Sequence, residues 1–544
     1  MLKLLNLRNL HLLAKIYSSC LQLSHVPHHW LLAEVTMLFK GSCPTSDESL
    51  DPSNYRAISL LSCIGKSLER ALQTRLMEFL LHFSKLDPQQ NGFVKGKSCD
   101  MHLFLLDELI SSTHPAIPVC FIDIKKAFPS VRRSSLLMAL HDIGVTGPVW
   151  HLIHQMYASN ASHITVGSSN SDPYSVQNGV REGAILSPLL YIIFLNALLR
   201  QLRDTAAGAH IGTAWAGALA FADDLAIIGT TLRRDPQGLQ LQRLLDTVGA
   251  FADNHMLSFG ADKTRILIFR PTSRLPSPTW TLTCMSGPLP PNTPPNQVPL
   301  AQEYKYLGVL LTTSLQWGPH VNNNVLPSLR MSSHRLTSAL ANTDTLSPTT
   351  CINVLRTYML PLMQYGAAIW AHTTHSESSR FPRPARQAID KPIHIVLRSI
   401  LGVNPTTSHR ACARELGWLG TDHAYALAKL SLAHRILKQP VSSLLRAALL
   451  HKWTKTVTDN NPTRPRVGGP SPFTADLYAV LSLIGERESF HNHLIENTHW
   501  SATQYARIKK NSPPTRYPTI LPPDLPWVFH CPKLPPRRPL DHLP

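Results

Sequence analysis

The spacing of apolar positions along this chain changes between helical and strand periodicity, which predicts a protein of mixed α and β structure. Helical spacing covers residues 2–23, 68–81 and 239–255. Short apolar runs at 118–122 and 266–269, bounded by polar residues, are typical of buried strands.

The second half of the chain is predominantly helical by the same criterion. Helices are predicted over 321–341, 351–370 and 388–401, with a shorter one over 476–486. The tail at 512–544 is basic and rich in proline, so we expect it to be extended or disordered.

The most informative stretch is 218–228, where two adjacent carboxylates stand between two apolar runs of strand length. The runs predict a β-hairpin with Asp223 and Asp224 at its turn. Two like charges flanked by residues that favour burial are costly to fold, and a divalent metal is the usual compensation. An ordinary solvated turn is the alternative, since aspartate is a common turn residue.

A second apolar strand ends in another carboxylate, Asp123. Two strands that bring three carboxylates to one sheet would make a two-metal site for phosphoryl transfer. The hypothesis is stronger than for either strand alone, because an isolated Asp-Asp pair is more often a simple turn.

These segments resemble the reverse transcriptase domain of LINE-type non-LTR retrotransposons, and further motifs of that family follow in its order. Residues 54–61 are similar to its fingers motif, and 90–98 to its Gly-Phe-Arg turn. Residues 177–188 resemble the glycine-rich loop and helix that hold template and nucleotide. Residues 257–269 and 304–310 resemble the lysine-bearing motif and the primer grip.

The resemblance implies an α+β fold of the right-hand polymerase type. Fingers and a palm with an antiparallel sheet would be followed by a helical thumb and a C-terminal region. We expect four parts: an N-terminal helix at 1–26, fingers and palm at 27–312, thumb and post-thumb helices at 313–445, and a Pro/Arg-rich, partly disordered region at 446–544.

By the same resemblance, the chain would be an RNA-directed DNA polymerase that extends a DNA primer on an RNA template. It would use dNTPs and two Mg²⁺ ions, with Mn²⁺ as an alternative. Asp123 and Asp223 would be the primary metal ligands, and Ile124 would lend its backbone carbonyl. Asp224 would be a secondary ligand, because adjacent strand residues cannot both face the same ions. Lys263 matches the proposed proton donor to pyrophosphate, with a solvated lysine as the alternative.

The nucleotide and template contacts are also carried over from the family. Phe128, five residues after Asp123, matches the aromatic steric gate beneath the sugar, with simple core packing as the alternative. The other expected contacts come from the fingers and the glycine-rich loop: Arg56, Lys66, Lys95, Lys97, Gly179, Arg181, Glu182 and Gly183.

Two positions depart from the family's pattern. Val94 stands where arginine is usual, and Glu182 stands where glutamine is usual. Lys95 and Lys97 could partly replace the arginine, although a lysine is a point charge and not a bidentate fork. The carboxylate of Glu182 would repel phosphates unless Arg181 or a lysine pairs with it. The alternative is therefore a degenerate, non-catalytic reverse-transcriptase-like RNA-binding protein; the intact aspartates favour the enzyme.

The charge balance agrees with a polyanionic partner. The 544 residues carry a formal net charge of +18 and a pI near 9.6, so RNA and DNA are favoured over a membrane. We therefore expect an RNA template, a DNA primer or target and dNTPs as partners, and no membrane. The sequence carries no signal for an oligomeric state.

The nine cysteines form no Cys-x-x-Cys pair and no zinc-like spacing with histidine. This favours a reducing compartment, and the N-terminus lacks the features of a signal peptide. We expect an intracellular protein of the nucleus or cytoplasm, not a secreted one. Because the chain starts almost at the fingers motif, we also expect it to lack the endonuclease of a complete element.

Overall fold

The computed structural model describes most of the 544 residues. Only these described residues are discussed below, and the expected disorder of 512–544 lies outside them. The described ranges are 5–40, 51, 54–112, 116–166, 169–271, 278–291, 293–341, 347–373, 383–465 and 470–511.

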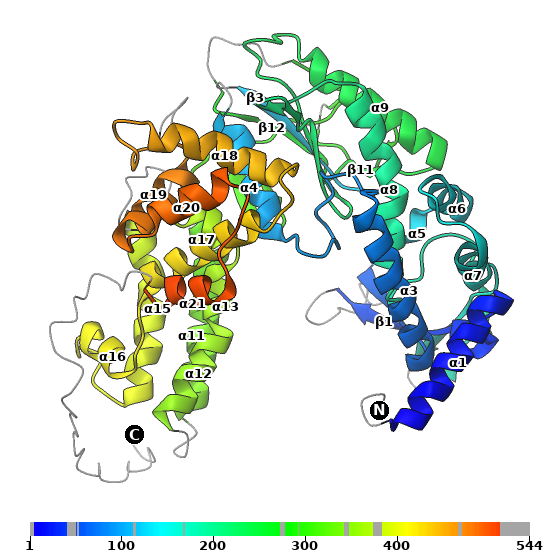
Figure 1. Cartoon of the computed structure of the whole chain (residues 1–544), viewed down its shortest axis with the longest axis horizontal. Helices are drawn as coiled ribbons and strands as arrows, with labels where there is room; N and C mark the ends of the chain where they lie inside the picture. The colour runs from blue at the N-terminus through cyan, green and yellow to red at the C-terminus, as the bar shows by residue number, and fades with distance from the viewer. Residues whose placement is uncertain are drawn as a thin grey trace.

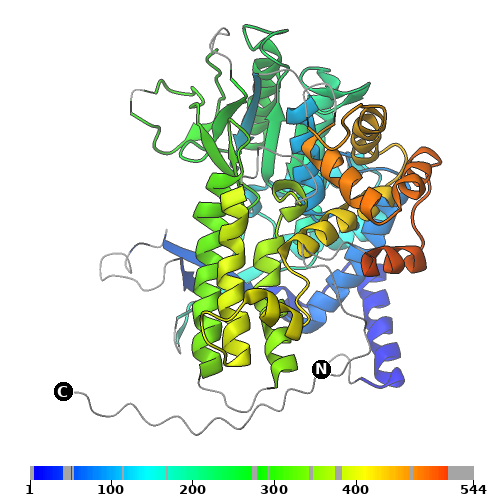
Figure 2. The same cartoon turned by 90° about the vertical axis from the view of Figure 1, so that its left-hand side faces the viewer.

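The chain forms an arch with two arms (Figure 1). The N-terminal elements make up one arm, the helices beyond residue 312 make up the other, and a central sheet joins them at the top. The quarter-turn view separates the long helices of the second arm from the C-terminal ones (Figure 2). The mixed α and β structure expected from the sequence is confirmed.

The central sheet is antiparallel throughout, with strand order β12-β3-β10-β9. Its middle strand β3 is buried at every position, which explains why its sequence is a continuous apolar run. The strands are β3 (Ile117–Ile122), β9 (Ala218–Phe221), β10 (Asp224–Ile228) and β12 (Arg265–Phe269).

Alternate residues of β3 face two different cores. Val119 and Phe121 belong to the cluster that contains helix α4 (Cys99–Ser112). Cys120 and Ile122 belong to the cluster that contains α8 (Ser187–Asp204) and α9 (Leu239–His255). The sheet is thus covered on both faces, and its strand ends carry the candidate acids.

A second sheet lies in the N-terminal arm, with order β2-β1-β4-β5 and with β6 paired to β4. Strand β1 is antiparallel to β2 and parallel to β4. These strands and the helices around them are β1 (Leu32–Phe39), β2 (Tyr55–Leu60), β4 (Ala161–Val166), β5 (Ser169–Asn170), β6 (Tyr174–Ser175), α1 (Leu7–Leu23), α2 (His28–Leu31), α3 (Cys63–His82), α5 (Ala127–Ser130), α6 (Arg133–Asp142) and α7 (Gly147–Ala158).

Short strand pairs lie outside the two larger sheets. Strands β14 (Glu303–Tyr306) and β15 (Val309–Thr312) form a hairpin next to the central sheet. The remaining two-stranded pairs are β7 (His210–Ile211) with β8 (Ala214–Trp215), and β11 (Phe259–Gly260) with β13 (Met285–Ser286).

The second arm is helical, but two of its expected helices differ in detail. The single helix expected over 351–370 is broken into three, because the chain turns at Met359 and at Gly366, whose φ is +65°. The helix expected from 321 opens with a π-helical segment, η4 (Val321–Val325). The helices are α10 (Gly318–His320), α11 (Leu326–Ala341), α12 (Pro348–Tyr358), α13 (Leu360–Gln364), α14 (Ala367–Trp370), α15 (Arg383–Leu401), α16 (His409–Glu415) and α17 (Thr421–Leu437).

The region from 446 contains more helix than its composition indicates. The sequence predicts one helix at 476–486, whereas the described residues of this region form four, and the first of them crosses the expected boundary at 445. The fully buried side chains of Trp453, Phe473 and Trp500 anchor them. These helices are α18 (Leu444–Val457), α19 (Pro472–Leu483), α20 (Arg487–Ile495) and α21 (Ala502–Lys510).

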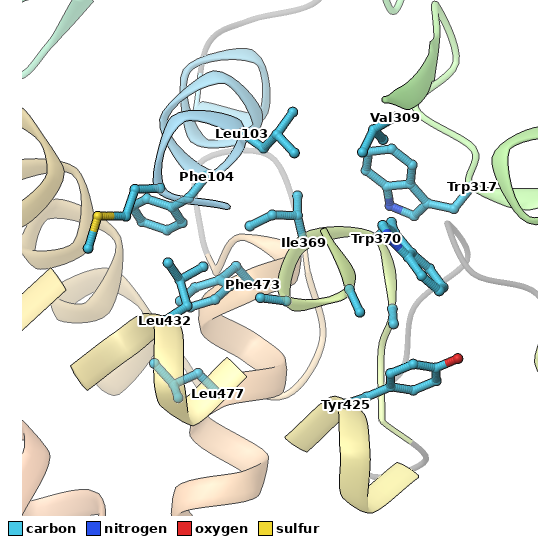
Figure 3. Packing of buried hydrophobic residues seen from close by; sticks show 14 of the residues in the cluster. Leu103, Phe104, Val309, Trp317, Ile369, Trp370, Tyr425, Leu432, Phe473 and Leu477 are labelled. Atoms are coloured by element: carbon cyan, nitrogen blue, oxygen red, sulfur yellow. The ribbon is translucent and has the colours of Figure 1, made fainter. Parts of the chain in front are cut away.

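The C-terminal helices pack against α4 (Figure 3). The rings of Phe104 and Phe473 lie 4.9 Å apart between centroids. Behind them the fully buried Lys429 and Asp476 form an ion pair at 3.0 Å. In the described part of the chain, no helix has the length and apolarity needed to cross a bilayer.

Candidate active site

The Asp-Asp hairpin is present as the sequence predicts. Strands β9 and β10 are joined by a two-residue turn, Ala222 and Asp223, and Asp224 pairs with Phe221 across it. Ala222 has a φ of +57°, a left-handed conformation that costs a non-glycine residue roughly 1–2 kcal/mol. Such strain persists only where the surroundings enforce it, as at many functional sites.

Asp123 directly follows the neighbouring strand β3, beside this turn. Ile122 pairs with Leu225 in antiparallel register, so the next residue, Asp123, comes level with Asp224. Backbone contacts hold its position: its carbonyl accepts from the Gly260 amide at 2.8 Å. A Cβ at Gly260 would lie 2.6 Å from Asp123 Oδ2, so a side chain at this position would displace the Asp123 carboxylate.

The three carboxylates interact electrostatically. Partial burial, together with repulsion from Asp223 and Asp123, raises the pKa of the Asp224 carboxyl to about 6. Burial and repulsion from Asp123 also raise the pKa of Asp223. The Asp224 side chain itself stays exposed to solvent. A nearby positive charge stabilises the ionised form of carboxylates that are partly buried and repel one another.

Lys263 supplies one such charge. Its Nζ lies 3.5 Å from Asp123 Oδ1, and the side chain is largely exposed. It belongs to the turn before β12, and not to the strand itself. The structure therefore brings Lys263 to the acids, as the family resemblance implies.

The donor atoms suit a hard divalent cation, but they are not gathered around one point. Carboxylate oxygens are the ligands that Mg²⁺ prefers. Across the described residues, however, no three His, Cys, Asp or Glu side chains lie close enough to hold a metal ion. A cation would have to draw Asp123 and the hairpin acids together.

The sequence left two roles open for Phe128, core packing and a wall beneath the sugar, and its surroundings are compatible with both. Its ring stacks on Tyr191 of α8, with centroids 5.1 Å apart and planes 13° apart, yet it remains partly exposed. Burial raises the pKa of Tyr191, with Asp223 and Asp224 adding to the effect, so this pair stands close to the acids. The ring is therefore both packed and available as a wall.

The glycine-rich loop needs its glycines for close backbone contact. A Cβ at Gly179 would lie 2.7 Å from the Pro129 Cα, and one at Gly183 would lie 2.3 Å from the Ser59 carbonyl oxygen. Both residues also have positive φ. The loop is thereby wedged between the Phe128 turn and strand β2.

Arg181 is not at the surface of this loop. It is buried, lies 3.3 Å from Glu69 of α3, and donates to the Trp30 carbonyl. Glu182 is partly buried, which raises its pKa, and Arg56 of β2 counteracts this. Arg181 pairs with Glu69 instead of Glu182, and the cation that acts on the Glu182 carboxylate is Arg56.

The turn at 90–98 also differs from expectation. Val94 is buried in the core, so an arginine there would not point toward phosphates. The Lys97 ammonium donates to the carbonyls of Pro88 and Gln90, both at 2.7 Å, and burial lowers its pKa to about 8. Lys95 stays exposed and can still meet a phosphate.

Sequence reasoning missed a polar network beneath the hairpin. Gln90, Asn91 and His102 are buried and hydrogen-bonded, and Tyr306 completes the network. The only signal in the sequence was the polar pair Gln90-Asn91 and one histidine within an apolar helix.

Comparison with known proteins assigns the family. Residues 43–311 match the profile described as reverse transcriptase (RNA-dependent DNA polymerase). A probable RNA-directed DNA polymerase from transposon BS of Drosophila melanogaster is 28% identical over 75% of this chain and 43% of its own length. The RNA-directed DNA polymerase from mobile element jockey of the same species is 25% identical over 70% of this chain and 39% of its own length.

A structural comparison gives a weaker likeness. The telomerase of Candida albicans, solved with a fragment of telomeric RNA, matches with 10% identity and a TM-score of 0.39. The match covers 82% of this chain and 66% of the other. The chain spans less than half the length of the transposon relatives named above. On the family profile and these sequence relatives, residues 43–311 of the chain belong to the reverse transcriptase family, with the polymerases of non-LTR retrotransposons among its relatives.

Proposed function

We propose that this chain is the RNA-directed DNA polymerase of a non-LTR retrotransposon. It would extend a DNA primer on an RNA template with dNTPs. The observation that carries the proposal is the strand register that brings Asp123 level with Asp224, next to Asp223, at adjacent strand ends of one antiparallel sheet. The family match and the names of the relatives support the same activity.

The fold can be divided on this basis. The sheet β2-β1-β4-β5 and its helices would be the fingers, and the sheet β12-β3-β10-β9 the palm, together spanning 27–312. The helices of 313–445 would be the thumb and post-thumb. The N-terminal part at 1–26 would be a separate element, whose helix α1 packs on α7. The helices of 444–510 are best treated as a folded C-terminal part that continues the second arm.

The donor set fits divalent cations, Mg²⁺ first and Mn²⁺ as an alternative. Asp123, Asp223 and the Ile124 carbonyl would hold them, with Asp224 as a secondary ligand. When bound, such ions activate the attacking hydroxyl and stabilise the leaving pyrophosphate. Lys263 stands at the rim of the acids, where its ammonium can meet an anionic leaving group.

The nucleotide contacts divide into direct and supporting residues. Phe128, backed by Tyr191, would form the wall beneath the sugar. Arg56, Lys66 and Lys95 are accessible to phosphates. Four residues are better understood as support for the loops that meet the ligand. Arg181 and Lys97 hold these loops through their hydrogen bonds, and Gly179 and Gly183 permit close backbone contact.

Two residues, Val94 and Glu182, suggested a non-catalytic protein, and the position of Val94 no longer supports that alternative. Val94 faces the core, so the absence of an arginine there does not remove a phosphate contact. Glu182 remains as an unusual charge, and Arg56 counteracts it. For a nucleic-acid polymerase we propose an intracellular location, in the nucleus or cytoplasm.

The direct test is primer extension by the purified chain. The substrate is a DNA primer annealed to an RNA template of defined sequence, incubated with dNTPs and Mg²⁺. We expect products whose sequence follows the template and whose formation stops in EDTA. A well-folded protein that binds the hybrid but makes no product in Mg²⁺ or Mn²⁺, at any dNTP concentration, would favour the non-catalytic alternative.

A further inference from the structure

The backbone is held by a buried side chain on each side of Asp223, at the Ala222 amide before it and at the Asp224 carbonyl after it. On one side, the Gln90 Oε1 accepts from the Ala222 amide at 3.0 Å and from the Gly92 amide at 2.8 Å. The two chain segments are so close that a Cβ at Gly92 would lie 2.1 Å from the Ala222 nitrogen. The turn is thus fixed against the 87–92 loop.

On the other side, a tyrosine reaches the hairpin from β14. The hydroxyl of Tyr306 lies 3.4 Å from the Asp224 carbonyl oxygen. The same hydroxyl lies 2.8 Å from His102 Nε2 of α4. Tyr306 and His102 are both almost fully buried, so bulk water does not compete for the bond between them.

The hydrogen bonds run in one direction, which defines the protonation of His102. Asn91 Nδ2 donates to the Gln89 carbonyl at 3.1 Å, and a carbonyl can only accept, so the amide orientation is fixed. The same nitrogen therefore donates to His102 Nδ1 at 3.1 Å. His102 must then carry its proton on Nε2 and donate to Tyr306, whose own proton is left for the Asp224 carbonyl.

Helix α4, which carries His102, is anchored at both ends. Near its start, Asp100 pairs with Arg435 of α17 at 2.8 Å. Near its end, Glu108 accepts from Ser471 at 2.5 Å. The helix therefore cannot tilt away from the hairpin without breaking contacts to the C-terminal helices. This makes α4 a rigid support for the series of hydrogen bonds from Asn91 through His102 and Tyr306 to the Asp224 carbonyl, which we call the relay.

We propose that Gln90, Asn91, His102 and Tyr306 are positioning residues that fix the Asp223 turn for catalysis. The inference rests on the proposed polymerase function, because it assigns these residues to the geometry of that site. None of them touches the reacting atoms. They act by holding the Ala222 amide and the Asp224 carbonyl, and so the direction of the Asp223 side chain.

The kinetic test uses Tyr306→Phe, which removes only the hydroxyl at the end of the relay. A small displacement of a reacting group can cost about a hundredfold in rate. We expect kcat for single-nucleotide incorporation to fall by about tenfold or more, with the nucleotide KM changed less than about twofold. His102→Gln keeps an N–H donor toward Tyr306 and should retain most of the activity, whereas His102→Leu should resemble Tyr306→Phe.

Tyr478→Phe is the matched control. It removes a hydroxyl that accepts from Arg487 at 2.7 Å on α19, far along the chain from the hairpin. Its kcat should equal that of the parent. Equal kcat for Tyr306→Phe and the parent would overturn the positioning role.

Two further readouts require no activity, so they separate this inference from the proposed function. In ¹⁵N-labelled parent protein, His102 should show the neutral Nε2–H tautomer and stay neutral at pH 5; His102→Gln identifies its signal. Amide exchange at the hairpin should be faster in Tyr306→Phe than in the parent. A His102 that protonates near pH 6, or carries its proton on Nδ1, would contradict the relay even if Tyr306→Phe fails to fold.

Discussion

Arg181 of the glycine-rich loop lies 3.3 Å from Glu69 of helix α3, and both side chains are buried. Glu69 also accepts from the Ile185 amide at 2.7 Å. The pair therefore ties the loop before α8 to the base of the N-terminal arm. A residue expected from the sequence to touch ligand instead holds the loop in place.

This pair gives the first prediction. Glu69→Ala should lower the free energy of unfolding by about 3–5 kcal/mol, because it leaves a buried guanidinium without its partner. Urea denaturation measures the change, and Glu78→Ala, at an exposed position of the same helix, is the control. A cost below about 1 kcal/mol would mean that the loop does not depend on the pair.

The burial of Val94 gives the second prediction. Val94→Arg, which would restore the usual residue of the family, should destabilise the protein by about 3 kcal/mol or more, because it buries an unpaired charge. It should not lower the nucleotide KM. Lys95→Arg, at the exposed neighbouring position, is the control for added guanidinium. A stable Val94→Arg variant with a lower KM would show that residue 94 can turn toward the ligand.

The coupled acids give the third prediction. Without divalent cations, Asp224→Asn should be more stable than the parent at pH 8, because it removes a carboxylate whose pKa is raised to about 6. A folded-state pKa above the unfolded value means that the parent loses stability as pH rises from about 4 to about 6. The advantage of the variant should therefore vanish below about pH 4.

Thermal unfolding with and without Mg²⁺ checks the same prediction. The cation should stabilise the parent more than Asp224→Asn, since it binds only the folded state. If the two proteins unfold alike at pH 8 in EDTA, the carboxylates do not repel one another as described.

The stacked pair of Phe128 and Tyr191 gives the fourth prediction. Phe128→Ala removes the wall and should weaken discrimination against ribonucleotides by at least about tenfold. The measurement is kcat/KM for a dNTP and for the matching rNTP. Phe83→Ala, which truncates an exposed phenylalanine at the end of α3, should leave the ratio unchanged. An unchanged ratio in Phe128→Ala would make Phe128 a packing residue only.

The elements that could be predicted are those whose apolar and polar residues form a recognisable pattern within a short stretch of sequence. The strand before Asp123 and the Asp223–Asp224 hairpin are short apolar runs that end in acids, and both are present. The direction of Val94 was not predictable, because the positive φ of Phe93, +56°, decides which neighbouring side chain faces the core. Nothing in a local pattern reports that conformation.

Long-range contacts account for the rest. His102 and Tyr306 are 204 positions apart, so their hydrogen bond has no sequence signature. The high proline content of the C-terminal region led us to predict too little helix there. Pro472 follows the cap Ser471 at the first position of α19, where proline favours a helix start.

The central claim is that Asp123 and Asp223 carry out metal-dependent nucleotide addition. The most direct measurement is single-turnover incorporation of one dNTP on an RNA template in Mg²⁺. The comparison is between the parent, Asp123→Asn, Asp223→Asn and the exposed control Asp246→Asn. The account predicts a rate at least about a hundredfold lower in both site variants and a parental rate in the control. Incorporation by Asp123→Asn or Asp223→Asn at the parental rate would contradict it.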